Sequence, residues 1–398
     1  MRRTRPPGPQ PQPPPTAPES LDALPLHVWP SNAPLPPLDR FAALRQLSLG
    51  PAAVRRGPRS LPPALEELSL DAAGLPAPGW LSQLTSLQRL ALRSASGGLE
   101  ALPRSLAALE LSGDAMDGAA LAPLVHLAGL RSLELSFCVA PGALAALPRS
   151  LTSLALEGEL AGLPPSLAAL TDLRELTATG PLAAGGFEHL PPGVTGLGLR
   201  DCALEKLPPA LSSLHSLRQL WAEGCAFASG WEHLPPGLTS LDLNDCEGLA
   251  AVPPALARLT GLQRLWAINC PLGGGFEALP PSVTTLNVMD CGLAALPASL
   301  SRLTALQKLW ATGNPLGGGF EALPPSLTFL MLDDCGLATV PPQLSALGGL
   351  RALHLAGCPV SGGWENLPAS LTLLDLSNCG LEEPPPALAA RPGLRVEL

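Results

Sequence analysis

Residues 238–281 read LTSLDLNDCEGLAAVPPALARLTGLQRLWAINCPLGGGFEALPP and contain two copies of one pattern, which begin at Leu238 and Leu262. Each copy places leucine at its first and fourth positions, leucine or alanine at its sixth, and cysteine at its ninth. Because successive side chains of a strand point to opposite faces, positions 4 and 6 predict a short strand with one buried face. The residues at positions 3 and 5 are then expected on the opposite face.

The pattern recurs along almost the whole chain of 398 residues. Successive copies are mostly about 21 or 23 residues apart, so the larger unit has about 44 residues. A single copy has no closed core, and stacking must bury the leucines as one continuous strip. The chain has seventeen copies and an incomplete one at 394–398. The seventeen copies begin at Leu21, Leu44, Leu65, Leu87, Leu106, Leu130, Leu151, Leu173, Val194, Leu217, Leu238, Leu262, Val283, Leu306, Leu327, Leu350 and Leu371.

These residues resemble the leucine-rich repeat family, whose unit is L-x-x-L-x-L-x-x-N/C-x-L. The resemblance covers residues 20–398 and implies an α/β solenoid of about 17 repeats. In this curved horseshoe, parallel strands line the concave face, and short helices, 3-10 turns or polyproline segments cover the convex face. The copy at Leu238 is similar to intracellular plant-type and Ras-group repeats. It alternates with a copy of GGFExLPP type, which resembles repeats of some protist proteins and bacterial ubiquitin-ligase effectors.

The convex segments of the two copies are expected to differ. Residues 297–303 suit a short helix or a 3-10 turn that begins at proline, where the missing N–H costs nothing. Residues 273–281 and 317–325 are rich in glycine and proline, and we expect a turn followed by a polyproline-like strand. Their aromatic residues recur every 44 or 45 positions and are expected to plug the convex end of the core. These are Phe187, Trp231, Phe276, Phe320 and Trp364.

Glycine and proline make up 89 of the 398 residues, a proportion typical of low complexity unless it is periodic. Residues 1–19 contain eight prolines and three arginines, and they predict a proline-rich disordered tail before the solenoid of residues 20–398. The final repeat, 391–398, is incomplete. Most remaining glycines and prolines occupy fixed repeat positions, where the chain must turn.

Charge and hydropathy exclude several classes of protein. The net charge of −9 offers no basic surface for nucleic acid. No apolar run reaches the roughly 18 residues that a membrane span needs, and no secretory signal is visible. We therefore expect a cytoplasmic protein, with attachment to the cytoskeleton or the ciliary axoneme as the alternative that the family resemblance permits.

All nine cysteines fall at position 9 of a repeat, a slot that Asn314 takes in one copy. In the family that the chain resembles, this side chain points inward against the loop backbone, and a structural role explains all nine. The sequence has no Cys-x-x-Cys, no H-E-x-x-H, no nucleophile elbow and no kinase signature. It predicts no metal, no cofactor and no catalytic site, and therefore a protein that is not an enzyme.

Position 5 carries the candidate binding residues, because it should face the concave surface between two buried positions. Tryptophan stands there in alternate repeats, and exposed tryptophan flanked by charge is typical of an interface hot spot. The alternative is that these tryptophans only shield the sheet. With its position-3 neighbours, the predicted partner-binding set is Trp221, Trp266, Trp310, His354, Asp242, Asn287, Asp375, Arg264 and Lys308.

The sequence thus favours a scaffold that binds a protein or peptide on its concave face and is itself a monomer. The N-terminal repeats have no tryptophan at position 5, so the second half of the arc should hold the partner. The alternative is the recognition part of a larger enzyme or receptor, such as a ubiquitin ligase, a kinase or a nucleotide-binding immune receptor. A reading frame that continues into a catalytic domain would favour this alternative.

Overall fold

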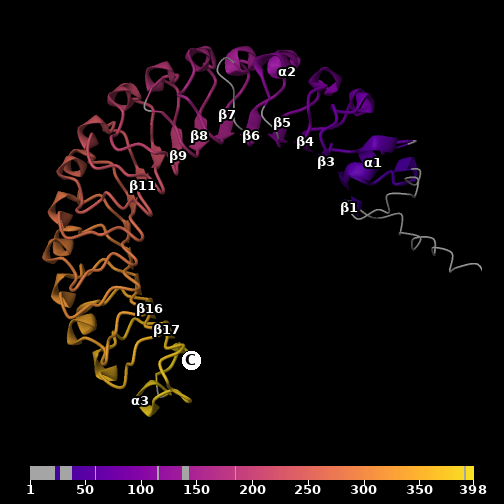
Figure 1. Cartoon of the computed structure of the whole chain (residues 1–398). Coiled ribbons are helices and arrows are strands. Elements are labelled where there is room, and N and C mark those ends of the chain that lie inside the picture. Colours follow the sequence, from indigo (N-terminus) through magenta and orange to yellow (C-terminus); the bar gives the residue numbers. More distant parts are fainter. Residues whose placement is uncertain are drawn as a thin grey trace, which may run out of the picture.

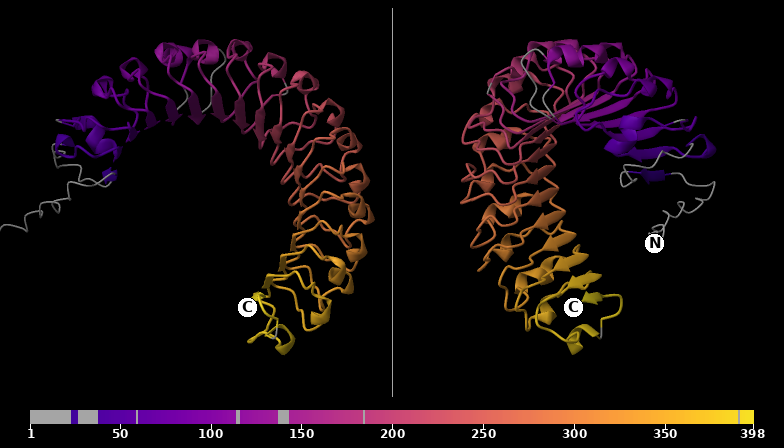
Figure 2. Two further views of the ribbon diagram at one scale, coloured as in Figure 1. Left: turned by 180° about the vertical axis from the view of Figure 1, so that it is seen from behind. Right: turned by 45° about the vertical axis from the view of Figure 1, so that its right-hand side comes forward.

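The computed structural model describes residues 23–26, 38–58, 60–113, 116–136, 143–183, 185–389 and 391–398. The predicted tail (1–19) and Cys138 lie outside these ranges. The chain forms a curved solenoid in which every strand lies on the inner rim and the short helices lie on the outer rim (Figure 1). The arc is not planar, because the strands of the two halves point in clearly different directions (Figure 2). The predicted α/β leucine-rich solenoid is confirmed.

One parallel sheet of 18 strands runs through the described residues, and each strand pairs with the next in chain order. This agrees with seventeen copies and an incomplete one. Strands β3 to β9 have five residues, and strands β10 to β18 have three. The strands are β1 (Ala23–Leu26), β2 (Gln46–Leu49), β3 (Glu67–Asp71), β4 (Arg89–Arg93), β5 (Ala108–Ser112), β6 (Ser132–Ser136), β7 (Ser153–Glu157), β8 (Glu175–Thr179), β9 (Gly196–Arg200), β10 (Gln219–Trp221), β11 (Ser240–Asp242), β12 (Arg264–Trp266), β13 (Thr285–Asn287), β14 (Lys308–Trp310), β15 (Phe329–Met331), β16 (Ala352–His354), β17 (Leu373–Asp375) and β18 (Arg395–Glu397).

The convex side consists almost entirely of 3-10 turns. The helices are η1 (Leu38–Arg40), α1 (Pro51–Arg56), η2 (Gly79–Gln83), η3 (Leu99–Ala101), α2 (Gly118–Leu121), η4 (Ala122–His126), η5 (Ala143–Ala146), η6 (Pro165–Ala169), η7 (Phe187–His189), η8 (Pro209–Ser213), η9 (Trp231–His233), η10 (Pro254–Arg258), η11 (Phe276–Ala278), η12 (Ala298–Arg302), η13 (Phe320–Ala322), η14 (Pro342–Ala346), η15 (Trp364–Asn366) and α3 (Pro386–Ala389). The 3-10 turn predicted within 297–303 is confirmed as η12, with Pro297 at its N-cap.

Residues 273–281 and 317–325 were expected to be too rich in helix breakers for a helix and to form a turn followed by a polyproline-like strand. Each does form a single turn followed by extended backbone, at Leu279 or Leu323, but the turn is a 3-10 helix, η11 or η13, that follows a glycine in the left-handed region. In η11 the Ala278 N–H donates to the Gly275 carbonyl oxygen, and Gly275 has a φ of 81°. The glycines lie before this turn and the prolines lie after it. They therefore determine where the turn begins and ends, and they do not prevent it from forming.

The core is a continuous strip of leucine between the sheet and the convex turns. Leucines at positions 1 and 4 are buried in almost every repeat, as at Leu238 and Leu241. The aromatic series closes the convex side of this strip: Phe187, Trp231, Phe276 and Phe320 are buried, and Trp364 is partly buried and packs against the core. Its predicted role as a plug is confirmed. Within the described ranges, none of the helices is long and apolar enough to cross a membrane.

Candidate binding surface

The in-register pairing of the strands turns position 5 into one continuous row across the concave face. Trp221 pairs with Asp242, Asp242 with Trp266, and the series continues strand by strand. Successive members are one strand spacing apart, about 4.8 Å. We call this the position-5 row; from β9 to β18 it consists of Gly198, Trp221, Asp242, Trp266, Asn287, Trp310, Met331, His354, Asp375 and Glu397.

The three tryptophans of the row are half-buried rather than fully exposed. Trp221 lies over Gly196 of the preceding strand, and a Cβ at Gly196 would stand 3.0 Å from its Cζ3 atom. Glycine at this position therefore lets the indole ring pack against the backbone of β9. Trp221 presents one part of its ring to the concave space, while another part covers the sheet.

Trp310 belongs to an aromatic cluster on three neighbouring strands. Its ring centroid is 4.9 Å from that of Phe329 on β15, and Phe329 is 5.2 Å from the ring of His354 on β16. Both pairs are tilted, within the separation that favours aromatic contacts. We call Trp310, Phe329 and His354 the aromatic cluster. Phe329 was not predicted, because the position-3 residues in the predicted set, Arg264 and Lys308, are those of the strands that carry tryptophan, whereas Phe329 belongs to the strand between Trp310 and His354.

Charged position-3 residues accompany the row. The Arg264 guanidinium lies over the Trp266 ring, with its Cζ atom 6.0 Å from the ring centroid, which is the geometry of a cation–π contact. The Nε atom of Arg264 is buried and has no hydrogen-bond partner among the described residues. Lys308 on β14 is exposed beside the aromatic cluster. Both residues occupy the predicted face.

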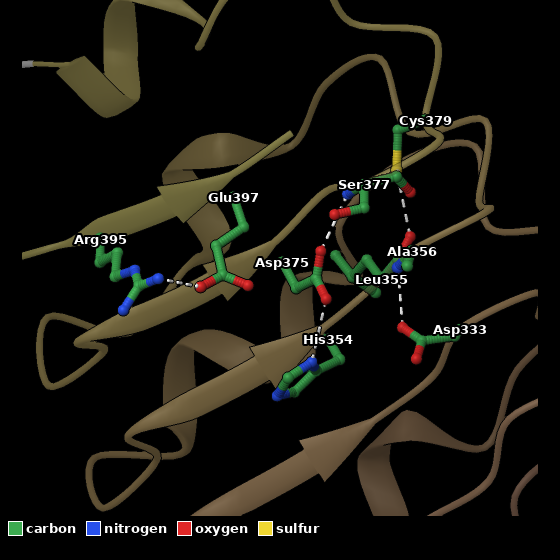
Figure 3. A network of polar contacts seen from close by, with 9 residues as sticks. All are labelled: Asp333, His354, Leu355, Ala356, Asp375, Ser377, Cys379, Arg395 and Glu397. Carbon is green, nitrogen blue, oxygen red and sulfur yellow. Dashed lines mark hydrogen bonds and ion pairs between the residues drawn. The ribbon is translucent and has the colours of Figure 1, made fainter. Parts of the chain in front are cut away.

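A polar network continues the row beyond the aromatic cluster (Figure 3). His354 Nδ1 lies 3.3 Å from Asp375 Oδ2, and Ser377 N donates to Asp375 Oδ1 at 2.9 Å. Burial opposes the ionisation of Asp375, but the contacts with Ser377 and His354 outweigh it and hold the pKa of Asp375 below its usual value. The pKa of Asp333 is shifted in the opposite direction. Burial raises it, although Ala356 N donates a hydrogen bond to Asp333 Oδ1 at 2.7 Å. This end of the row therefore carries a fixed negative charge.

Two polar members of the row, Asp242 and Asn287, differ in their exposure to solvent. Asp242, between Trp221 and Trp266, is half-buried, and loss of solvent raises its pKa. Asn287 was predicted as a contact residue, but only 7% of it is exposed. Its Oδ1 accepts a hydrogen bond from Met289 N at 3.2 Å, so the side chain folds back onto its own turn. The structure therefore removes Asn287 from the accessible part of the surface.

The cysteines at position 9 play a structural role, as predicted for those within the described ranges. They are unbridged, and their thiols donate to backbone carbonyls of a neighbouring repeat, as Cys246 does to Ala222 at 3.1 Å and Cys270 to Leu243 at 3.0 Å. Burial raises the pKa of Cys246 and Cys270 to about 12, so both are protonated at neutral pH. Among the described residues, no group of three or more His, Cys, Asp or Glu side chains could hold a metal ion.

Comparison with known proteins supports the fold. The Leucine Rich Repeat family model matches residues 370–390, and a search of curated proteins found no match. A leucine-rich repeat protein of Leptospira interrogans is 20% identical in sequence, with a TM-score of 0.61; the match covers 92% of this chain and 93% of that protein. TLR13, in its complex with ssRNA13, is also 20% identical, with a TM-score of 0.61, over 90% of this chain and 58% of TLR13. The repeats, the single parallel sheet and these similarities together show that the chain has the leucine-rich repeat fold.

Proposed function

We propose that the chain is a non-enzymatic scaffold that binds a protein or peptide partner on the concave face of strands β10 to β17. The aromatic cluster is the observation that carries this proposal. Its three rings form a continuous patch on a face that none of the described helices or strands covers, and aromatic residues dominate the binding energy of interfaces.

The surroundings of the cluster supply the rim that such an interface needs. Arg264 and Lys308 lie on the position-3 side of the row, and Asp242 and Asp375 lie within it. Charges around a partly buried aromatic centre orient a partner and exclude wrong ones. The partner should therefore combine apolar side chains with charges of both signs. We place this activity in the cytoplasm, and we place the boundary between the proline-rich N-terminal segment and the repeats after residue 19.

A selection experiment tests the proposal and needs no natural partner. Peptides selected for binding to the wild-type protein from a random displayed library would be measured against a variant with Trp310→Ala and Phe329→Ala. Loss of two anchor side chains should weaken binding by at least about thirtyfold, since each anchor contributes over about 1 kcal/mol. The matched control is Trp364→Ala, a half-buried tryptophan on the convex side.

Binding that survives the double substitution on the concave face would refute the aromatic cluster as the site. Equal loss in the Trp364→Ala control would also refute it, because the effect would then come from the stability of the solenoid. Thermal unfolding of all three proteins separates these outcomes.

A further inference from the structure

The N-terminal half of the concave face contains a hollow of about 570 Å³ over strands β2 to β6. Its floor is formed by position-5 residues with small side chains, Ser48, Ser69 and Ala91, which leave space that the tryptophans occupy in the other half. We call this the N-terminal hollow. It lies apart from the aromatic cluster and has no part in the function proposed above.

The far side of the hollow carries two neighbouring carboxylates. Glu110 on β5 and Glu134 on β6 pair directly opposite each other in the sheet, about one strand spacing apart. Like charges that face each other across neighbouring strands destabilise a sheet. The other charged lining residues, Glu67 and Arg89, neutralise each other in an ion pair of 2.9 Å. Within the described part of the chain, no ion pair involves Glu110 or Glu134, so the hollow has a net negative charge.

The chain itself contains a segment of complementary charge. Residues 1–18 include Arg2, Arg3 and Arg5 and no acidic residue. This segment precedes β1, which pairs with β2 at the near end of the hollow. We propose that the N-terminal segment of the same chain docks in the N-terminal hollow, with its arginines against Glu110 and Glu134.

The length of the segment permits this contact. Glu134 lies five strands from β1, a path of about 24 Å along the sheet. The 18 residues from Arg5 to Ala23 span up to about 56 Å in a polyproline conformation. This reach exceeds the distance to Glu134, so the arginines can contact both carboxylates. A tether of this length holds its end at roughly millimolar effective concentration, which favours the tail over a weakly binding basic peptide from another molecule. Proline also limits the conformational entropy that docking must remove.

Photo-crosslinking in the full chain tests this docking. A photoreactive phenylalanine analogue at Thr4 would be irradiated in dilute protein, and the crosslinks would be mapped by mass spectrometry. Intramolecular crosslinks should concentrate in residues 89–136. Their yield should fall at least about threefold when Glu110→Gln and Glu134→Gln are combined, and it should also fall as salt is raised from about 0.05 M to 0.5 M.

The matched control combines Glu277→Gln and Glu321→Gln, two exposed glutamates of the convex turns, and should leave the yield unchanged. Three results would overturn the proposal. Crosslinks could be scattered or fall in the C-terminal half, their yield could be equal in both double variants, or they could join two molecules, which would make a second copy the occupant. Since glutamine keeps the shape of glutamate, both double variants should remain folded, which thermal unfolding checks.

Discussion

The two halves of the solenoid share a scaffold and differ on the concave face. Strands β2 to β9 carry serine, alanine, threonine, glycine and glutamate at position 5, whereas β10 to β17 carry tryptophan, aspartate, asparagine, methionine and histidine. Among the positions that face the core, position 4 is leucine in both halves, and position 1 is leucine or, at Val194 and Val283, valine. Stacking constrains the positions that face the core, and the concave positions are free to diverge. The first half therefore offers a hollow and the second half an aromatic patch.

If the scaffold is shared, the same core substitution should have the same cost in both halves. Phe187 and Phe276 are buried at equivalent convex positions, so either Phe→Ala substitution should lower the free energy of unfolding by about 3–5 kcal/mol. Trp310→Ala, on the half-buried concave row, should cost less, about 1–2 kcal/mol. Urea denaturation measures all three. A small effect of Phe187→Ala alone would show that the two halves are built differently.

The turn before each short 3-10 helix offers a second comparison. Gly98 and Gly230 have φ values of 78° and 85°, and a Cβ would lie 2.7 Å from Ala77 N or 2.6 Å from Leu207 O. Either Gly→Ala substitution should cost about 3 kcal/mol, since strain and steric overlap add. Gly336, with a φ of 70° and no atom within 4 Å of a Cβ, is the control and should cost about 1 kcal/mol. Equal melting temperatures for the Gly230 and Gly336 variants would contradict the close packing of neighbouring turns.

Position 9 distinguishes one repeat within the C-terminal half. Asn314 is fully buried; its Oδ1 accepts from Cys291 N and Leu293 N, and its Nδ2 donates to Val288 O and Ala311 O. Asn314→Cys installs the residue of the neighbouring repeats, whose thiol can still donate to a carbonyl oxygen. It removes the amide oxygen that accepts from Cys291 N and Leu293 N, at a cost of about 2 kcal/mol. Chemical denaturation measures the loss. An unchanged midpoint would show that asparagine and cysteine are interchangeable in this slot.

Two aspartates of the position-5 row should respond to pH with opposite signs. The pKa of Asp375 is lowered, so its ionised form stabilises the fold at neutral pH, and this contribution disappears as the pH falls through its folded pKa. The pKa of Asp242 is raised, so its ionised form destabilises the fold, and protonation relieves the cost as the pH falls through the raised pKa.

Asp375→Asn should therefore lower stability at pH 7, and Asp242→Asn should raise it, each by about 1 kcal/mol or less. The Asp242 difference should vanish in acid below the ordinary aspartate pKa, whereas the Asp375 difference should shrink below that value and vanish below the lowered pKa of Asp375. Denaturation curves at pH 7 and at about pH 2.5 measure them. A shift of the same sign for both variants at pH 7 would contradict the assigned environments.

The repeat pattern predicted the fold because each leucine position reports directly on burial. It also predicted the position-5 row, since a period of two fixes which side chains share a face. It could not predict how side chains lean across strands. Trp221 rests on Gly196 of the preceding strand, Phe329 bridges Trp310 and His354 from position 3, and Asn287 folds back onto Met289. These contacts depend on neighbouring repeats that are distant in sequence.

The central claim is that the position-5 row of the C-terminal half binds a partner. The most direct measurement is quantitative capture of proteins from cell extract by the wild type, by a triple variant with Trp221→Ala, Trp266→Ala and Trp310→Ala, and by the Trp364→Ala control. We predict that recovery of the specific partner falls at least about tenfold with the triple variant and is unchanged with the control. Equal recovery by the wild type and a folded triple variant would contradict the claim.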